Sequence, residues 1–374
     1  MTLTSLLAAL AIAFSITSGA ACATTSVEGP LPPLSGKGAL APDGSGLVLA
    51  TRGGGVLLVD LPGGHAHELL QARGARILGF RWDPTLESIA ILRQDGALEL
   101  VDRKGKARRA PIDTRAKHLG RQLLGRSVDF AADGTVLVVA GGSSAGTLWS
   151  VLTGERIATL GDETTRTTTG HALSKDGELL ALGDEDGAIH IWKTRTGEHS
   201  AGPLELKDPV YALDFDPSGK QLAIGAGDCT LRVWDLSTRD EVRTFSHCDA
   251  DLFGGLAIHA VRFSPDGSRL VSTTSSFFEA RMWNLATSEL LWKYDYGGGN
   301  PGSVQPAFTP DGKTVVLSRY GVVIDAEAGT VQRTLAQGAG VRTDGGLSWT
   351  THGNTLRVFD PATADPILTR AIGQ

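Results

Sequence analysis

Short stretches of alternating apolar and polar residues recur along the chain, separated by turns that are rich in Gly, Pro and Asp. In the clearest unit, residues 210–215 alternate before one turn, residues 221–224 follow it, and residues 231–235 end in Trp-Asp. Period-two alternation bounded by turn-forming residues is typical of β-strands. A fourth, more polar stretch at 241–245 closes this unit, and no sustained helical period follows residue 24. The pattern therefore predicts repeated units of four antiparallel strands.

One tetrapeptide marks the turn between the first two strands of each unit. Its clearest copy is Ser264-Pro265-Asp266-Gly267, and looser copies recur at steps of 42–48 residues, except for a last step of 33. Pro presets φ, Asp bonds its own backbone, and Gly accepts positive φ, so the tetrapeptide forms a tight turn. A period near 40–45 residues predicts a radial all-β array. The chain contains eight third strands, which favours eight blades. Seven blades are the alternative, because the first strand of the eighth unit is short.

The unit resembles the WD-repeat β-propeller family over about residues 36–370. The family's third strand ends in Trp-Asp, which this chain carries as Trp234-Asp235. The resemblance implies that the four third-strand tryptophans pack between blades: Trp149, Trp192, Trp234 and Trp283. The family's His–Ser/Thr–Asp–Trp hydrogen-bond tetrad is expected in one or two blades at most, with Ser246-His247 nearest to its Gly-His pair. Outside that register lie Trp82, Trp292 and Trp349, which are candidates for exposure.

The first residues resemble an export signal. Residues 3–16 are apolar and too short for an ordinary membrane-spanning helix, and small residues precede Cys22. We predict a signal peptide at 1–21, a lipidated Cys22 with a Pro-rich tether at 22–35, and a propeller at 36–374. Cleavage by ordinary signal peptidase is the alternative. The expected location is the bacterial cell envelope, anchored by lipid and facing the periplasm, or else the periplasm or medium in soluble form.

Two further cysteines, Cys229 and Cys248, fall in turns that a four-stranded meander places on the same face. In an oxidising compartment they form a possible disulfide that would hold the loop at 246–256. Two unpaired thiols are the alternative.

Charge is unevenly distributed along the chain. The net charge is −6, which argues against a nucleic-acid partner, yet residues 103–126 are strongly basic. A candidate patch for an anionic partner starts this segment: Arg103, Lys104, Lys106, Arg108 and Arg109. The alternative is a solvated edge whose charges prevent strand pairing.

Candidate chemistry is sparse. Ser144 lies in a G-x-S-x-G pattern without the helix that a nucleophile elbow needs, and His65 and His67 are two ligands where a zinc site needs three or four from the protein. We predict no cofactor, no metal and no catalytic residue. Positions at the starts of first strands read as mostly apolar or small, which favours a scaffold over an enzyme.

The predicted function is therefore a non-catalytic, monomeric scaffold for protein partners of unknown identity, bound to a membrane by its lipid anchor. The loop at 246–256 is the candidate recognition element, with four possible partner-binding residues: His247, Asp249, Asp251 and Phe253. The alternative is a lactonase-like or quinone-dependent dehydrogenase-like enzyme, or a ligand sensor, with its site in the central channel.

Overall fold

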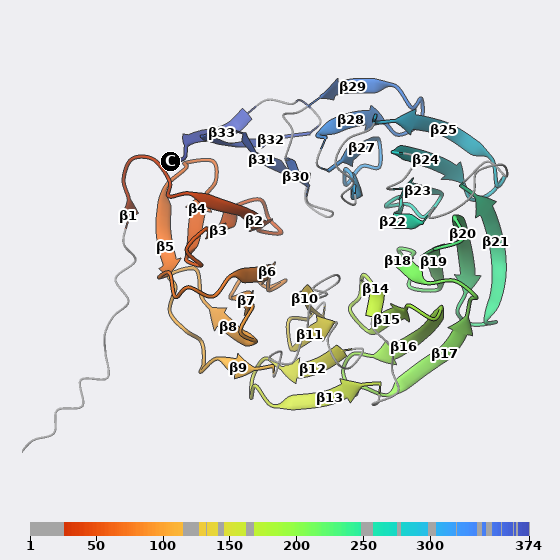
Figure 1. Ribbon diagram of the computed structural model, residues 1–374, viewed down its shortest axis with the longest axis horizontal. Coiled ribbons are helices and arrows are strands. Elements are labelled where there is room, and N and C mark those ends of the chain that lie inside the picture. The colour runs from red at the N-terminus through yellow and green to blue at the C-terminus, as the bar shows by residue number, and fades with distance from the viewer. Residues whose placement is uncertain are drawn as a thin grey trace, which may run out of the picture.

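The computed structural model is a ring of eight sheets, each a blade of a β-propeller (Figure 1). It describes residues 26–114, 127–131, 133–140, 146–161, 168–247, 257–274, 278–297, 304–318, 320–334, 339–341, 346–352, 354–361, 363 and 366–373. Eight blades, rather than seven, are confirmed. Throughout these described ranges the chain forms strands and turns, and no helix is long and apolar enough to cross a membrane.

The first four blades follow one another along the chain, and in each the strands run in order from the inside of the ring to its outside (Figure 1). Blade 1 contains β2 (Leu34–Leu40), β3 (Gly46–Thr51), β4 (Val56–Asp60) and β5 (Ala66–Leu70), and blade 2 contains β6 (Ile77–Trp82), β7 (Ile89–Arg93), β8 (Ala97–Val101) and β9 (Ile112–Asp113). Blade 3 contains β10 (Ser127–Phe130), β11 (Val136–Ala140), β12 (Gly146–Ser150) and β13 (Arg156–Leu160), and blade 4 contains β14 (Thr168–Leu173), β15 (Leu179–Asp184), β16 (Ala188–Lys193) and β17 (His199–Glu205).

The last four blades repeat this meander. Blade 5 contains β18 (Val210–Phe215), β19 (Gln221–Ala226), β20 (Thr230–Asp235) and β21 (Asp240–Ser246), and blade 6 contains β22 (Ile258–Phe263), β23 (Arg269–Thr274), β24 (Glu279–Asn284) and β25 (Leu290–Asp295). Blade 7 contains β26 (Pro306–Phe308), β27 (Thr314–Leu317), β28 (Val322–Asp325) and β29 (Val331–Thr334), and blade 8 contains β30 (Ala339–Val341), β31 (Ser348–His352), β32 (Thr355–Phe359) and β33 (Pro366–Ala371). The short last step of the repeat spans the four-residue strands β27, β28 and β29 of blade 7 and the three-residue β30.

The hydrophobic core lies between blades rather than at one centre. Each buried cluster draws side chains from two adjacent blades, as when Leu231 and Phe245 of blade 5 pack with Val261 and Trp283 of blade 6. Both faces of the middle strands are consequently buried, which explains why β7, β11 and β27 are buried along their whole lengths and are mostly apolar. Ring closure thus contributes to the burial of every blade.

The Pro-Asp-Gly turns form as the sequence predicts. At Ser264–Gly267 the amide of Gly267 donates to the carbonyl of Ser264 at 2.9 Å, and Gly267 takes φ +73°. The Asp266 carboxylate accepts the Ser264 hydroxyl and the Ser268 amide at 2.5 and 3.0 Å, and these bonds lower the pKa of Asp266 to about 2. The turn is therefore held by its own side chains.

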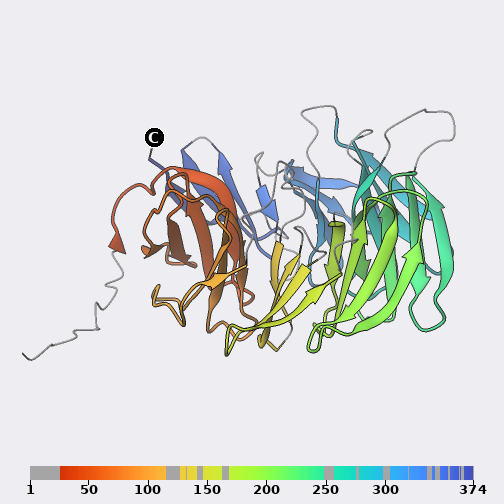
Figure 2. The same ribbon diagram turned by 60° about the horizontal axis from the view of Figure 1, so that its bottom comes forward.

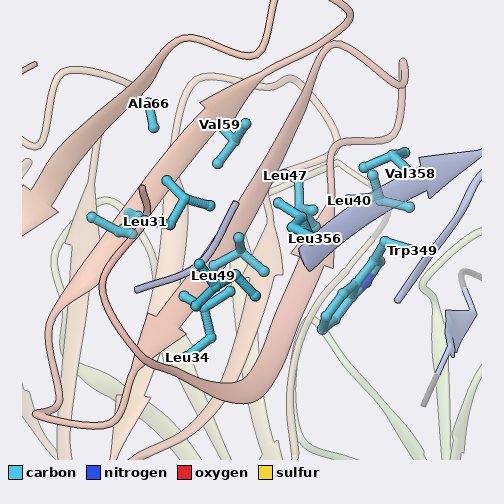
Figure 3. Close-up of a cluster of buried hydrophobic side chains, with 12 residues drawn as sticks. Leu31, Leu34, Leu40, Leu47, Leu49, Val59, Ala66, Trp349, Leu356 and Val358 are labelled. Carbon is cyan, nitrogen blue, oxygen red and sulfur yellow. The ribbon is translucent and has the colours of Figure 1, made fainter. Parts of the chain in front are cut away.

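An N-terminal segment closes the ring between blades 1 and 8. β1 (Ser26–Val27) pairs with β5 on the outer edge of blade 1, while the amide of Leu31 donates to the carbonyl of Ala371 at 2.8 Å. Leu31 is fully buried and lies in the cluster that joins the two blades, where Trp349 and Val358 of blade 8 face Leu47 and Leu49 of blade 1 (Figure 3). β1 and the C-terminus accordingly lie on the same side of the ring (Figure 2).

Arg370 on β33 binds this N-terminal segment from the blade 8 side. Its guanidinium donates to the carbonyl of Val27 at 2.6 Å and also to the carbonyl of Gly64 in blade 1. The predicted tether at 22–35 is therefore corrected from residue 26 onward, because β1, the buried Leu31 and the start of β2 belong to the propeller.

Candidate functional site

Ionisable side chains lie on the inner strands of five successive blades, which surround the ring axis in Figure 1. We call this set the inner belt: Arg81 on β6, Asp129 on β10, His171 on β14, Asp214 on β18 and Arg262 on β22. Arg81 and Asp129 form a two-point ion pair between blades 2 and 3, with Nε–Oδ1 and Nη2–Oδ2 distances of 3.0 and 2.9 Å. Bidentate Arg–carboxylate pairs of this kind set the orientation of both groups.

The second ion pair of the inner belt joins blades 5 and 6. Nη1 of Arg262 lies 2.7 Å from Oδ1 of Asp214, and the amide of Phe263 donates to Oδ2 of Asp214 at 2.8 Å. Burial raises the pKa of Asp214, while Arg262 and the Phe263 amide act in the opposite direction. Nε of Arg262 is buried with no hydrogen-bond partner.

His171 on β14 of blade 4 lies between the two ion pairs. Burial lowers the pKa of His171, the Asp129 carboxylate raises it, and the Arg81 and Arg262 charges lower it further. His171 therefore interacts electrostatically with charged groups of both ion pairs. The arrangement runs Arg–Asp–His–Asp–Arg across blades 2 to 6, so positive charge flanks negative charge on each side of the imidazole.

The inner belt adds charged groups to inner strands whose starts are otherwise mostly apolar or small. Its pairs join residues 48 positions apart, one on each of two adjacent units, so alternation within a single unit gives no signal for them. Each carboxylate bonds a guanidinium, so the belt presents mixed charge rather than free bases. In the part of the chain that the structure describes, no group of three or more His, Cys, Asp or Glu residues could hold a metal ion.

His247 does not lie on the surface as a partner-binding residue should. It is fully buried, and its Nδ1 lies 2.8 Å from Oγ of Ser272, which also accepts Nε1–H of Trp283 at 3.0 Å. Burial, with a smaller effect of the Arg281 charge, lowers the pKa of His247 to about 3. His247 thus braces blade 6, and the prediction that it binds a partner is corrected.

All four third-strand tryptophans lie against the preceding blade. Trp149 and Trp283 are buried in the clusters shared by blades 2 and 3 and by blades 5 and 6, and Trp192 and Trp234 pack against those of blades 3 and 4 and of blades 4 and 5. The tryptophans outside that register are buried as well, because each finds a partner in a neighbouring blade. Nε1 of Trp82 donates to Ala39 and Nε1 of Trp292 to Ala326, at 3.0 and 3.1 Å, and Trp349 packs in the closure cluster.

The candidate basic patch is divided by its contacts. Arg103 bonds Ser45 and lies 3.5 Å from the Asp60 carboxylate, and Arg108 pairs with Glu87 at 3.1 Å. Two nitrogens of Arg109 are buried, and Arg109 packs where a side chain on Gly154 of blade 3 would otherwise lie. Exposed Lys104 and Lys106 remain, so the described part of the patch mainly joins blades 1, 2 and 3.

Several predicted residues fall outside the described part of the chain and stay predictions: Cys22, Cys248, Asp249, Asp251 and Phe253, together with the signal peptide at 1–21. Cys229 is disulfide-bonded, and the carbonyl of Cys229 accepts the amide of His247 at 3.0 Å. The residue beside Cys248 therefore lies next to Cys229. Because Cys248 lies outside the described residues, its disulfide with Cys229 stays a prediction.

Comparisons with known proteins agree with this architecture. A family model described as "WD domain, G-beta repeat" matches residues 202–235, which include the inner strand of blade 5 and end at Trp234-Asp235. The periodic tryptophan protein 2 homolog of Dictyostelium discoideum is 32% identical over 121 residues, 32% of this chain and 13% of that protein. Eukaryotic translation initiation factor 3 subunit I of Neurospora crassa is 30% identical over 118 residues, 32% of this chain and 31% of that protein. These findings support a WD-repeat propeller.

The matches cover about a third or less of these relatives. The predicted location in a bacterial cell envelope is contradicted by them, because the matched proteins come from eukaryotes, and one is a translation initiation factor subunit.

Proposed function

We propose that this chain is a non-catalytic interaction scaffold that binds protein partners on the faces of its ring. The observation that carries the proposal is the closed ring itself: adjacent blades share their cores, and N-terminal residues fasten blade 8 to blade 1. A ring built this way holds its connecting loops in fixed relative positions, which suits recognition of a folded partner.

The similarity to an initiation factor subunit supports a role within a protein assembly. The inner belt supports it as well, because both of its carboxylates are neutralised by guanidinium groups instead of being free for acid–base chemistry. We propose further that the propeller itself is monomeric and that it recruits its partners one to one.

Affinity capture with the wild type and two double variants tests the proposal. One variant, Arg81→Gln with Asp129→Asn, removes an exposed ion pair of the inner belt, and the other, Val242→Thr with Val331→Thr, changes exposed apolar residues on the outer strands. We expect purified wild-type protein to retain a reproducible set of proteins, of which at least one binds the pure chain directly in a 1:1 complex. Retention that differs between the two variants would show which surface the partner uses.

The alternative, an enzyme or sensor with a site on the ring axis, predicts a different result. Small molecules would then raise the thermal unfolding temperature of the wild type but not that of the Arg81→Gln, Asp129→Asn variant. An increase in the thermal unfolding temperature with a small molecule, together with the absence of any direct protein partner, would overturn the proposed scaffold function.

A further inference from the structure

Two histidines on the outer half of blade 4 face each other across adjacent strands. Nδ1 of His190 on β16 lies 3.0 Å from Nε2 of His199 on β17, and both side chains reach solvent. The ring of His199 also meets the edge of Trp192, with 4.7 Å between centroids. Three aromatic rings thus hold the facing nitrogens in position.

The separation of these nitrogens suits a chelated metal ion. Metal–imidazole bonds are about 2.0–2.1 Å long, so two bonds that meet at a right angle end about 2.9 Å apart. A tetrahedral angle would instead place the nitrogens about 3.4 Å apart. The observed 3.0 Å is the length of the present hydrogen bond and lies nearer the first value, so the rings change their separation least to fill two adjacent positions of a square-planar or tetragonal ion, the geometry that is diagnostic of Cu²⁺ and Ni²⁺.

We propose that His190 and His199 form a binding site for a tetragonal divalent ion and that this site binds Cu²⁺ most tightly. The ion takes Nδ1 of His190 and Nε2 of His199, and water occupies its remaining positions. The hydrogen now held between the two nitrogens moves through solvent to the other nitrogen of the same ring, so that both facing lone pairs are free. No electron is transferred, and the site stays open to an external ligand. The site stands independently of the scaffold function.

One positive charge acts on the histidine pair, because the Arg239 guanidinium interacts electrostatically with His199. Arg239 lies in the turn before β21 of blade 5 and also repels a bound cation. Removing this charge should therefore strengthen metal binding.

The other histidine pair in sequence, His65 and His67, lacks this geometry. Nε2 of His67 bonds the carbonyl of Arg103 at 3.0 Å, and His65 is exposed in the preceding turn. His65→Gln is therefore a matched control that removes an exposed imidazole elsewhere on the ring.

Titration of the full chain with CuSO₄ in a buffer that does not bind metal tests the site, read by calorimetry, electron paramagnetic resonance and Trp fluorescence. We expect one strong Cu²⁺ per chain, coupling to two nitrogens, quenched Trp fluorescence and weaker binding of Zn²⁺. Since loss of even an outer-shell partner weakens metal binding about 10–100-fold, His190→Gln and His199→Gln should each weaken it at least as much. His65→Gln should bind like the wild type, and Arg239→Gly should bind more tightly.

Three results would overturn the site: undiminished strong Cu²⁺ binding in the His190→Gln, His199→Gln double variant, Zn²⁺ binding more tightly than Cu²⁺, or no strong binding by the wild type. Circular dichroism of each variant shows that the fold is intact, since neither histidine belongs to a buried cluster.

Discussion

Oγ of Ser272 lies 2.8 Å from Nδ1 of His247, and this contact joins the end of blade 5 to the second strand of blade 6. The same hydroxyl accepts Nε1–H of Trp283 at 3.0 Å, so one oxygen bonds one nitrogen of each of two buried rings. In the His–Ser/Thr–Asp–Trp tetrad of the WD-repeat family, an Asp also belongs to this network. Nε2 of His247 is buried without a hydrogen-bond partner, which indicates that blade 6 holds three of the four members.

Removing the shared hydroxyl should destabilise the ring. In Ser272→Ala, Nδ1 of His247 and Nε1 of Trp283 lose a common partner inside a buried site, which costs about 1–3 kcal/mol. Urea unfolding monitored by Trp fluorescence measures the loss. Ser272→Thr keeps the hydroxyl and should retain most of the stability; an alanine variant as stable as the wild type would show that the network contributes nothing.

The buried His247 should make stability depend on pH. Its pKa falls from an ordinary 6.5 to about 3 on folding, so between these values the unfolded chain binds a proton that the folded chain excludes. The stabilisation is complete above pH 6.5 and is lost as the pH falls towards 3, by up to about 1.4 kcal/mol per pH unit. His247→Gln should flatten the pH profile of the unfolding free energy in this window. An unchanged slope would mean that His247 titrates normally in the folded protein.

Blades 4 and 5 lack the acceptor that Ser272 provides. Strand register places Leu182 and Ile224 where blade 6 has Ser272, and Nε1 of Trp192 and of Trp234 are buried without a partner. Placing a hydroxyl at position 224 should therefore satisfy Trp234.

A comparison of Ile224→Thr with Ile224→Val isolates that hydrogen bond, because Thr and Val have the same shape. At an ordinary buried site the hydroxyl costs about 1–3 kcal/mol, but here we expect Thr to equal or exceed Val in unfolding free energy. Val139→Thr in blade 3 is the control, since Nε1 of Trp149 already bonds Thr147 at 2.9 Å. Equal penalties at both positions would refute the idea.

The repeat was predictable because each turn and third strand carries its signal within a few residues. The Ser264–Gly267 turn and the Trp234-Asp235 strand end follow from local chemistry, and their spacing gave eight blades. Contacts between units gave no such signal. Arg81 and Asp129 lie in different repeats, and only ring curvature brings their strands together.

The same limit explains the other corrections. Leu31 stands in a Pro-rich polar segment that reads as a tether, yet it is buried because β33 supplies a partner from the far end of the chain. Trp292 is outside the third-strand register, but the next blade offers it the carbonyl of Ala326. The alternation of apolar and polar residues predicts which side chains are buried. The blade against which they pack depends on how the ring closes.

The turn between the third and fourth strands of a blade can pack against the neighbouring blade. Gly329 of blade 7 has φ +69°, and a Cβ there would lie 2.5 Å from the ring of Trp292 in blade 6. Ser288 of blade 6 occupies the equivalent position with φ +61°, but its side chain is exposed. Position 329 requires Gly because its φ is positive and because Trp292 leaves no room for a Cβ. At position 288 the positive φ strains the backbone of Ser, and its side chain makes no packing contact that would offset this strain.

Opposite substitutions should therefore have opposite effects. Gly329→Ala should cost about 2 kcal/mol or more, through left-handed backbone strain and displacement of Trp292. Ser288→Gly should add about 0.5–1 kcal/mol, since relief of the left-handed conformation exceeds the added chain entropy of Gly. Denaturant unfolding of both variants measures the two changes. If Ser288→Gly were destabilising by as much as Gly329→Ala, the turn would depend on its side chain rather than on its backbone, and the account of blade packing through these turns would be wrong.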